Sequence, residues 1–451
     1  MTAEVKDNRA VTQDMIERFT DDFRSNPQHK VLMNAIKQNG INAVAMDQDA
    51  EVNMQQTFSH EIKSDKITDQ KQSGRCWMFA GLNTLRHEVA NNCNLKSFEL
   101  SENYLTFWDK FEKANYLLES ILDTLDEPLD SRIVQWLLMD PIQDGGQWDM
   151  FTSLVDKYGV MPKYVMPETY HSSRSGAMNE LVTQKLREDA AKLRKQYQEE
   201  GVSPESLRDQ KPALLNEIFR MLAHFLGEPP KRFDFEYRDK DETFHRDTNI
   251  TPQEFYQKYV TINLHDYVSL INAPTEDKPF GRTFTVKYLG NVSGGQDVFY
   301  LNVPMETLKE ATKQQIENNE PVWFGCDVTK MLNSKSGILD TAMYDYESAL
   351  DVSMNLTKAE QLDYGNSQMT HAMVLQGVNI AEDGNPNRWK VENSWGEKPG
   401  KDGYFVMSDD WFNEFMYQVV VRKDYLPEEL QTALNQEPIA LEPWDPMGSL
   451  A

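Results

Sequence analysis

The sequence predicts an α+β fold, in which a helix-rich part of the chain precedes a strand-rich part. Apolar residues follow helical spacing in much of the chain before about residue 275. From about residue 280 short alternating runs take over, separated by turn residues: FTVKYL, VFYLNV, PVWFGCDV, HAMVLQGVNI, RWKVENSW, GYFVMS and YQVVV. Because helices and strands are segregated instead of alternating, this order favours α+β over a parallel βαβ fold.

These changes in texture also predict how the chain is organised. We expect five consecutive segments, namely an N-terminal arm over 1–60, a helix-rich half over 61–175, a helical insertion over 176–275, a β-rich half over 276–430 and a C-terminal arm over 431–451. The insertion is predicted to be helical because its charges fall at helical spacing up to about residue 226. The sequence TPQE at 251–254 is typical of a capping box with proline at the first helical position.

Composition narrows the classes of function. The net charge of −26 repels phosphate backbones, so nucleic acid is an unfavourable partner. No window reaches the roughly 20 apolar residues that cross a bilayer, and the polar first residues lack a secretory pattern. Three cysteines are too few for a disulfide framework. We therefore expect a soluble cytoplasmic protein that does not bind membranes.

Cys76 is the candidate nucleophile. It follows the loop-like QKQSGR and precedes apolar residues at the positions of one helix face, namely Met78, Leu82, Leu85 and Val89. Cys76 is therefore predicted near the first turn of a helix that packs into the core. There, backbone N–H groups and the helix dipole favour the reactive thiolate. Cys93, late in the helix, and Cys326, inside a strand-like run, are expected to be inert core residues.

His371 and Asn393 are the candidates for the base and for its orienting partner. A thiolate nucleophile needs a group that holds its proton and later delivers it to the leaving amine. His371 opens the strand-like run HAMVLQGV, and Asn393 lies one strand later in WKVENSWG. A side-chain amide can accept the imidazole N–H and fix the tautomer, and Trp395 could shield that bond from water.

Acyl transfer also needs hydrogen-bond donors for the oxyanion. The Cys76 backbone N–H at the helix start is one donor, and a glutamine just upstream could supply a second. Spacing alone does not choose between Gln70 and Gln72. The cysteines and histidines show no spacing typical of metal ligands, so we expect neither a metal nor a cofactor.

Several segments, in this chain order, resemble the papain family of cysteine peptidases. QKQSGRCWMF is similar to the family's active-site segment, in which an aromatic residue, here Trp77, follows the cysteine. LSENYL resembles the segment after the catalytic helix, and Gly145 and Gly146 resemble the glycine pair beside the substrate backbone. HAMVLQGV and VENSWG resemble the His and Asn strands, and GKDGYFVMS the closing hairpin. The joint match extends from about residue 65 to 425.

This resemblance implies that Cys76, His371 and Asn393 are catalytic and that Gly145 and Gly146 bind substrate. It also implies Gln70 for the oxyanion, because the family's glutamine lies six residues before the cysteine. Two features depart from the family. Ser73 stands where secreted members have a disulfide cysteine, which fits a reducing cytosol. The cysteine and histidine are also separated by far more than the usual distance of about 130 residues, and the helical insertion accounts for the excess.

The departures and the segments SGRCW, GRTFTVKYLGNVSGG and PWDPMGSLA resemble one branch of the family, that of bleomycin hydrolase and bacterial aminopeptidase C. That resemblance implies a homohexamer whose active sites face a central cavity. It also implies that the C-terminal arm, 431–451, lies in the active-site cleft. The terminal carboxylate of Ala451 would then meet the free α-amino group of the substrate in a charge-assisted contact.

The sequence therefore predicts a cysteine aminopeptidase that removes N-terminal amino acids from peptides with a free N-terminus through a thioester acyl-enzyme. Its side-chain tolerance is expected to be broad and to include amide hydrolysis of the bleomycin-hydrolase kind. Two alternatives are a papain-like endopeptidase with a disordered tail and a non-catalytic nucleic-acid-binding cage on the same fold. The net charge of −26 argues against the second alternative.

Overall fold

The structure, a computed structural model, describes residues 9–63 and 65–449. By its internal contacts the chain divides into two compact units. One unit comprises the chain up to residue 53 together with 341–355, and the other comprises 54–340 and the chain from 356 onward. The described residues that the sequence analysis singled out for chemistry all belong to the second unit, which we call the large unit.

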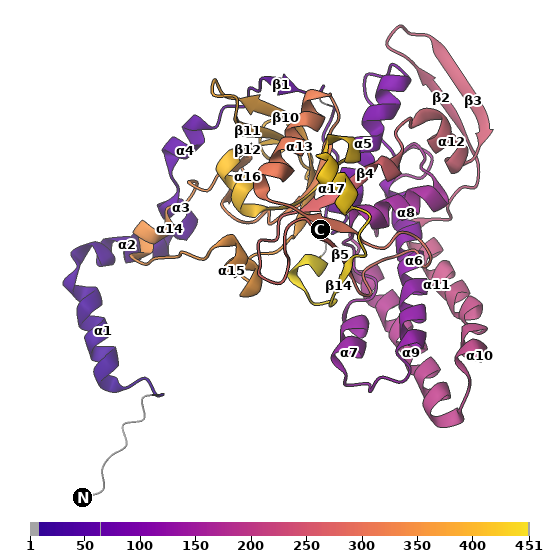
Figure 1. The fold of residues 1–451 in the computed structure, drawn as a ribbon, viewed down its shortest axis with the longest axis horizontal. Helices are drawn as coiled ribbons and strands as arrows, with labels where there is room; N and C mark the ends of the chain where they lie inside the picture. Colours follow the sequence, from indigo (N-terminus) through magenta and orange to yellow (C-terminus); the bar gives the residue numbers. More distant parts are fainter. Residues whose placement is uncertain (1–8, 64, 450–451) are drawn as a thin grey trace, which may run out of the picture. The chain divides into compact units, whose positions relative to one another are not determined.

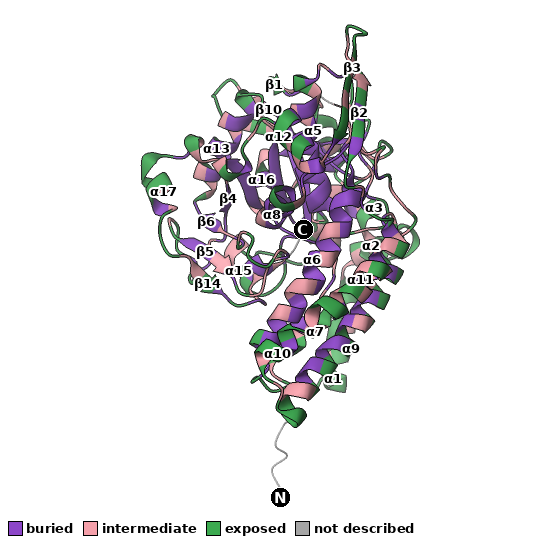
Figure 2. Ribbon diagram, turned by 90° about the vertical axis from the view of Figure 1, so that its right-hand side faces the viewer, coloured by how far each residue is buried: buried purple, intermediate pink, exposed green. Residues whose placement is uncertain are grey.

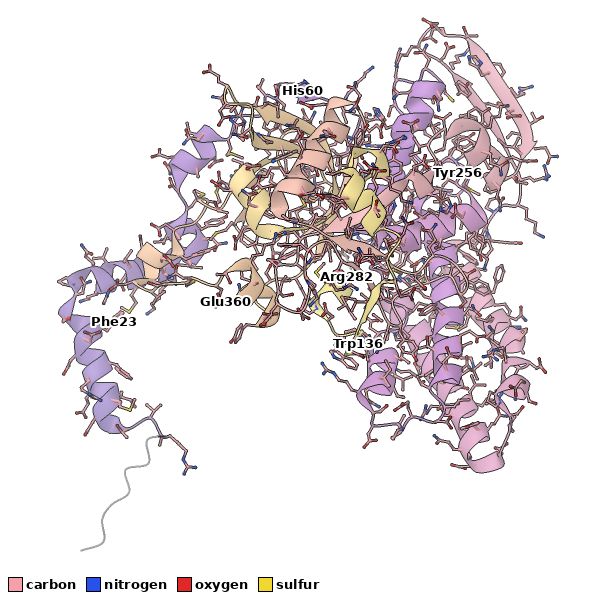
Figure 3. All side chains as sticks on the ribbon, viewed as in Figure 1. Phe23, His60, Trp136, Tyr256, Arg282 and Glu360 are labelled. Atoms are coloured by element: carbon pink, nitrogen blue, oxygen red, sulfur yellow. The ribbon has the colours of Figure 1, made fainter. Side chains whose placement is uncertain are left out.

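The small unit is built from short helices: α1 (Gln13–Ser25), α2 (Pro27–Asn39), α3 (Ile41–Ala45), α4 (Gln48–Asn53) and α14 (Tyr346–Leu350). Helix α1 buries no residue, and the labelled Phe23 on it is exposed (Figure 3). An ion pair of 3.2 Å between His29 and Asp351 joins α2 to the later segment. The sequence pattern did not indicate that 341–355 belongs with this unit.

The helices of the large unit begin with α5 (Cys76–Asn92), α6 (Glu102–Asp123), α7 (Arg132–Met139) and α8 (Trp148–Tyr158). They continue with α9 (Gly176–Glu200), α10 (Pro204–Arg208), α11 (Lys211–Leu226) and α12 (Pro252–Tyr259). Helices α6, α9 and α11 pack side by side (Figure 1). The capping box expected at the start of α12 is confirmed, since the Thr251 and Glu254 side chains each accept the other residue's backbone N–H. In the described part of the chain, no helix combines the length and the apolar character needed to cross a membrane.

The predicted helical insertion, 176–275, also contains a β-hairpin that the sequence analysis did not anticipate. Its strands are β2 (Phe233–Arg238) and β3 (Phe244–Ile250). Phe233 and Phe235 alternate with exposed charged residues and pack against Phe255 of α12. This period of two in FDFEYR is typical of a strand, and the surrounding helical pattern obscured it.

The strand-rich part forms one large sheet, and the predicted α+β order is confirmed. The strands follow the order β14-β5-β6-β4-β13-β7-β10-β11-β12-β9-β8, with β1 paired to β10. Their bounds are β1 (His60–Glu61), β4 (Tyr267–Ile271), β5 (Thr283–Val286), β6 (Tyr300–Asn302), β7 (Val322–Cys326), β8 (Leu332–Asn333), β9 (Ile338–Leu339), β10 (His371–Ile380), β11 (Pro386–Glu392), β12 (Tyr404–Ser408), β13 (Met416–Arg422) and β14 (Ile439–Leu441). The remaining α-helices are α13 (Met305–Glu317), α15 (Lys358–Asp363), α16 (Asp409–Phe415) and α17 (Glu428–Ala433).

Helix α5 packs against β10 and β7 on one side and against α6 and α8 on another. The apolar spacing predicted one buried face, but the helix is buried on all sides over its first three turns (Figure 2), polar Asn83 and Thr84 included. The Trp323 indole N–H, on β7, donates to the Trp77 carbonyl at 3.0 Å. These contacts fix the N-terminus of α5 against the sheet.

A buried ion pair also joins α5 to the sheet about three turns after Cys76. The Arg86 guanidinium on α5 lies 2.6 Å from the Glu392 carboxylate, and the two side chains are 5% and 0% exposed. Glu392 is the last residue of β11 and immediately precedes Asn393. The pair therefore ties the helix that carries Cys76 to the end of β11, directly before Asn393.

Replacing Arg86 alone should unfold the protein more easily. We expect Arg86→Met to reduce the free energy of unfolding by about 3 to 5 kcal/mol, because Glu392 would stay buried without its partner. Urea denaturation measures this loss, and Arg86→Met combined with Glu392→Gln should recover most of it. The control is Lys195→Ala, whose ion pair with Glu199 is exposed and should contribute less than about 1 kcal/mol. Equal losses in the two single variants would contradict the role assigned to Arg86.

Candidate active site

Cys76 is the first residue of α5, and its thiol is 2% exposed. The residue before it, Arg75, provides no side-chain cap, so the first backbone N–H groups of the helix are left for other acceptors. Burial raises the pKa of the Cys76 thiol to about 11, while backbone hydrogen bonds from Ala372, Trp77 and Cys76 itself act to lower it. The sulfur therefore lies at the helix start and beside the backbone of β10.

His371 lies at the point where β10 begins, next to Ala372 in the chain. Its Nε2 is 2.9 Å from Asn393 Oδ1, and both side chains are buried. The Ser394 backbone N–H donates to the same Oδ1 at 2.8 Å, which identifies that atom as the amide oxygen. Nε2 of the neutral ring therefore carries the proton, and Nδ1 is left to accept one. Burial lowers the pKa of the His371 ring to about 4, against an opposing effect of the Asn393 hydrogen bond.

The Trp395 ring packs against the His371 ring. The Trp395 ring lies 5.0 Å from the His371 ring, inclined by 40°, on the chain segment that follows Asn393. The structure thus brings Trp395 to the place that the sequence analysis expected, where it excludes water from the hydrogen bond between His371 and Asn393.

The structure also distinguishes the two glutamines. Gln70 is buried, and its amide oxygen accepts the Ser394 hydroxyl at 2.6 Å while its amide nitrogen donates to the Ser73 carbonyl at 2.6 Å. Gln72 is exposed, and its backbone N–H donates to the Ser173 carbonyl at 3.0 Å. The geometry therefore brings Gln70 to the cluster and leaves Gln72 outside it.

Gly145 and Gly146 lie against the residue that follows the nucleophile. The Trp77 indole N–H donates to the Asp144 carbonyl at 2.7 Å, and a Cβ on Gly146 would overlap the Trp77 ring. Only glycine fits at 146 in this backbone position. The buried Lys113, on α6, donates to the Gly145 carbonyl at 2.7 Å. Sequence analysis missed this lysine because charged residues on a helix usually face solvent.

The C-terminal arm reaches the same region. Gln147, the residue after Gly146, donates from its side chain to the Ser449 carbonyl at 2.8 Å. A cavity of about 520 Å³ opens here, lined in part by Gln368, Met369 and Thr370, which precede His371, and by Gly448 and Ser449. The predicted contact of Ala451 lies outside the described residues.

The described part of the arm is anchored along its length. Strand β14 pairs in parallel with β5, and the Lys278 ammonium lies 2.9 Å from the Asp445 carboxylate. The Arg132 guanidinium lies 3.9 Å from the centre of the Trp444 ring, which also meets Trp136 of α7 edge to face. Trp136 is labelled in Figure 3. These contacts hold residues 439–449 against the large unit.

Of the remaining cysteines, Cys326 pairs with His371 in the register between β7 and β10, whereas Cys93 lies at the C-terminal end of α5. Cys93 and Cys326 are buried free thiols whose pKa values burial raises. His87 lies further along α5 and contacts Asn91. Within residues 9–63 and 65–449, no three histidine, cysteine or acidic side chains gather as metal ligands would.

Comparison with known proteins matches residues 10–448 to the Peptidase C1-like family. Aminopeptidase C of Listeria monocytogenes serovar 1/2a is 53% identical over 441 residues, which cover 98% of this chain and 99% of that protein. Aminopeptidase C of Lactobacillus helveticus is 46% identical over 446 residues, with the same coverage of 98% and 99%. The crystal structure of PepW from Lactobacillus rhamnosis HN001 superposes with a TM-score of 0.96 at 51% identity, covering 98% of this chain and 99% of that one.

The site geometry predicts how Cys76 reacts when its neighbouring base is removed. In His371→Gln, the thiol keeps its burial, which raises its pKa to about 11, so it should be protonated and unreactive at pH 7. We expect alkylation by iodoacetamide at pH 7 to slow by about 10²- to 10⁴-fold and to recover only as the pH rises above 9.

Alkylation rates measured between pH 5 and 11 by mass spectrometry test this expectation. Cys76→Ala reports the background from Cys93 and Cys326. A His371→Gln variant that is alkylated at pH 7 as fast as the intact protein would show that the imidazole does not take the thiol proton.

Proposed function

Because this chain belongs to the Peptidase C1-like family, we propose that it is a cysteine aminopeptidase that removes N-terminal amino acids from peptides. The family match and the PepW superposition confirm the papain-like α+β fold that the sequence predicts. The observation that carries the proposal is the cluster itself, in which the Cys76 thiol lies beside the start of β10 and His371 is hydrogen-bonded to Asn393.

The cluster supports acyl transfer through a thioester. The Cys76 sulfur attacks the peptide carbonyl carbon while the His371 ring takes the thiol proton at Nδ1. The carbonyl oxygen becomes an oxyanion that accepts hydrogen bonds from the Gln70 amide and the Cys76 backbone N–H. When the C–N bond breaks, the His371 ring gives its proton to the leaving amine. A water molecule, deprotonated by the same ring, then attacks the thioester, releases the N-terminal residue as a free acid and restores the thiol.

Asn393 acts through His371. Its Oδ1 accepts a hydrogen bond from the Nε2–H group at 2.9 Å. This bond leaves Nδ1 as the nitrogen that exchanges protons with the sulfur. The amide is neutral, so it orients the ring without adding a charge to a buried site. This arrangement explains why an amide suffices where the nucleophile itself supplies the negative charge.

The C-terminal arm supports removal of single N-terminal residues over internal cleavage. Its anchored end contacts Gln147, the residue after Gly146, and in the proposed complex it would occupy space that a longer substrate needs. Peptides with a free α-amino group are therefore the proposed substrates. The same observations argue against an endopeptidase with a disordered tail, since Lys278, Tyr300 and Gln147 each hold a residue of the arm.

The cavity supports broad side-chain tolerance, including the amide hydrolysis expected from the resemblance to bleomycin hydrolase. At about 520 Å³ it is larger than most amino-acid side chains, and its lining mixes apolar groups such as Leu117 with polar groups such as Gln143. The lining also includes the charged side chains of Lys113, Asp140 and Lys287, so it is not matched to one class of substrate side chain.

Three further expectations remain proposals. We place the protein in the cytoplasm, because Cys76, Cys93 and Cys326 are all free. Assembly as a homohexamer stays a prediction from the resemblance, and the exposed apolar side chains Phe19 and Phe23 of α1 are of the kind found at subunit contacts. The nucleic-acid-binding cage stays the less favoured alternative, because the net charge is −26.

The first activity test removes the nucleophile. Cys76→Ala should lower the hydrolysis of aminoacyl-naphthylamides by about 10⁴-fold or more, because no thioester can form. Cys93→Ala is the matched control, since it removes a buried free thiol outside the cluster and should leave kcat/KM within about twofold. Undiminished turnover by Cys76→Ala would rule out the proposed mechanism.

The second activity test opens the cleft. Deletion of residues 443–451 should lower kcat/KM for substrates with a free α-amine by about tenfold or more, the contribution of one charge-assisted contact. The same deletion should allow cleavage of N-acetylated peptides, which the intact chain should reject. The test is to measure the hydrolysis of free-amine and N-acetylated substrates by the intact protein and by the deletion variant. If neither rate changes, the endopeptidase alternative stands.

A further inference from the structure

The loop that carries Gln70, residues 70–75, makes few apolar contacts of its own. Gln72 and Gly74 are exposed, and Lys71 has a positive φ of 56°, a conformation that costs energy for a residue with a Cβ. No disulfide holds this loop, because all three cysteines are free. Something outside the loop must therefore keep it in the shape that directs Gln70 toward Ser394.

The stretch of chain that leads into the insertion, residues 168–179, provides such a support, and we call it the bracing segment. The Ser173 carbonyl accepts the Gln72 backbone N–H at 3.0 Å. The Glu168 carboxylate accepts both terminal nitrogens of Arg75, at 2.7 and 3.2 Å. Arg75 is 1% exposed, so this fork-shaped ion pair is largely shielded from water.

Asp144 connects the bracing segment to the loop a second time. Its Oδ2 accepts the Gly74 backbone N–H at 2.9 Å and the Ser175 hydroxyl. Its Oδ1 accepts the Asn179 side-chain amide at 2.8 Å and the Lys110 ammonium at 2.6 Å. Four donors from three separate parts of the chain thus converge on one carboxylate.

The carboxylate is held in its charged form. Burial opposes ionisation, but Lys110 and the hydrogen bonds from Asn179 and Ser175 together keep the pKa of Asp144 well below its usual range. Lys110 is itself buried and also donates to the Ile142 carbonyl at 2.6 Å. A charged acceptor fixed on both sides has little freedom to turn, so the position of Gly74 N–H is fixed as well.

The path from Asp144 to Gln70 is short. Gly74 is bonded to Ser73, whose carbonyl accepts the Gln70 amide at 2.6 Å and whose hydroxyl donates to the Gln70 carbonyl at 2.7 Å. Arg75 reinforces the same residue, since its Nε donates to the Ser73 hydroxyl at 2.9 Å. A shift of Gly74 would therefore move the group that aims the Gln70 side chain.

We propose that Asp144 is a positioning residue for the peptidase reaction, through which the bracing segment holds Gln70 and the N-terminus of α5 in the geometry that binds the oxyanion. The inference rests on the proposed function and adds a role for the insertion. Asp144 touches neither substrate nor the reacting atoms. The charge of Asp144 also helps to raise the pKa of the Cys76 thiol, and Ser175→Ala with Asn179→Ala leaves that charge in place, so the effect of this double variant passes through Gly74 and Ser73.

The test uses side chains on the bracing segment, which touch neither substrate nor the reacting atoms, in the full-length protein. The variant Ser175→Ala with Asn179→Ala removes two of the four donors to Asp144, and Gln184→Ala removes an exposed amide from the same helix as a matched control. We expect kcat and kcat/KM of the double variant to fall by about tenfold with KM unchanged, less than the 10²- to 10³-fold loss typical of removing an oxyanion donor outright. The control should match the intact protein.

Two further readouts separate positioning from general loss of structure. A peptide aldehyde adds to the thiol and forms an oxyanion-like group, so its affinity should fall by the same factor as kcat/KM. Iodoacetamide reacts with the sulfur without forming an oxyanion, so its rate with Cys76 should stay within twofold of the intact protein. Equal losses in both reactions would overturn the proposal, because they would indicate that the thiol itself is disturbed.

Asp144→Asn provides a second variant that keeps the size of the side chain and removes its charge. Asp144→Asn should lower kcat and aldehyde affinity together, as is expected of Ser175→Ala with Asn179→Ala. Unchanged kinetics in both of these variants would overturn the proposal. The outcome is distinguishable from failure of the proposed function. An inactive Cys76→Ala with unaffected bracing variants removes only the positioning role, whereas an active Cys76→Ala removes the peptidase assignment itself.

Discussion

The buried contact between the N-terminus of α5 and the start of β10 is the constraint on which the site depends. Cys76 and His371 are nearly three hundred residues apart in the chain, and only this packing brings them together. The helix is held at its first turn by Trp323 and further along by Arg86, so it can neither slide nor rotate relative to the sheet. Because interiors pack at nearly crystalline density, a small change in these contacts would move the sulfur.

In the proposed mechanism, burial couples the ionisation of Cys76 to that of His371. Taken singly, the thiol of Cys76 and the imidazole of His371 are both driven toward their neutral forms, since burial raises the pKa of the first and lowers that of the second. A proton passed from sulfur to ring creates two opposite charges at once, in a place where their attraction is little screened. In the proposed mechanism, the N-terminus of α5 stabilises the thiolate and Asn393 orients the imidazolium. Neither group would carry its charge there alone.

The features of the site that follow from local residue patterns could be predicted from the sequence, and those that depend on distant contacts could not. Apolar periodicity and helix-start position identified the helix of Cys76, and alternating runs identified the strands of His371 and Asn393, because such patterns are local. The choice of Gln70 over Gln72 could not be made from spacing, since it depends on a contact with Ser394 more than three hundred residues later. Resemblance supplied that choice, and the geometry agrees with it.

Buried charges were beyond the reach of the sequence. Lys110, Lys113 and Arg86 lie on helices whose charge spacing is typical of solvated faces, yet all three are buried and paired. The partners of Lys110 and Arg86, Asp144 and Glu392, are distant in the chain and leave no local pattern, whereas Lys113 pairs with Asp109 four residues earlier, a spacing that is equally common on exposed helix faces. The β2–β3 hairpin and the membership of 341–355 in the small unit were missed for related reasons, one hidden in a helical context and the other set by distant contacts.

The loop before Cys76 illustrates what a protein without disulfides must do instead. A disulfide limits the unfolded chain, whereas hydrogen bonds and ion pairs act only once the native structure has formed. The contacts of Asp144 and Glu168 with this loop therefore stabilise its native geometry directly, whereas a disulfide would act by limiting the unfolded chain. Hydrogen bonds and ion pairs are also insensitive to reducing conditions, unlike a disulfide. Ser175 immediately precedes the insertion and Asn179 lies in its first helical turn, so the chain around the start of the insertion helps to hold this loop through Asp144.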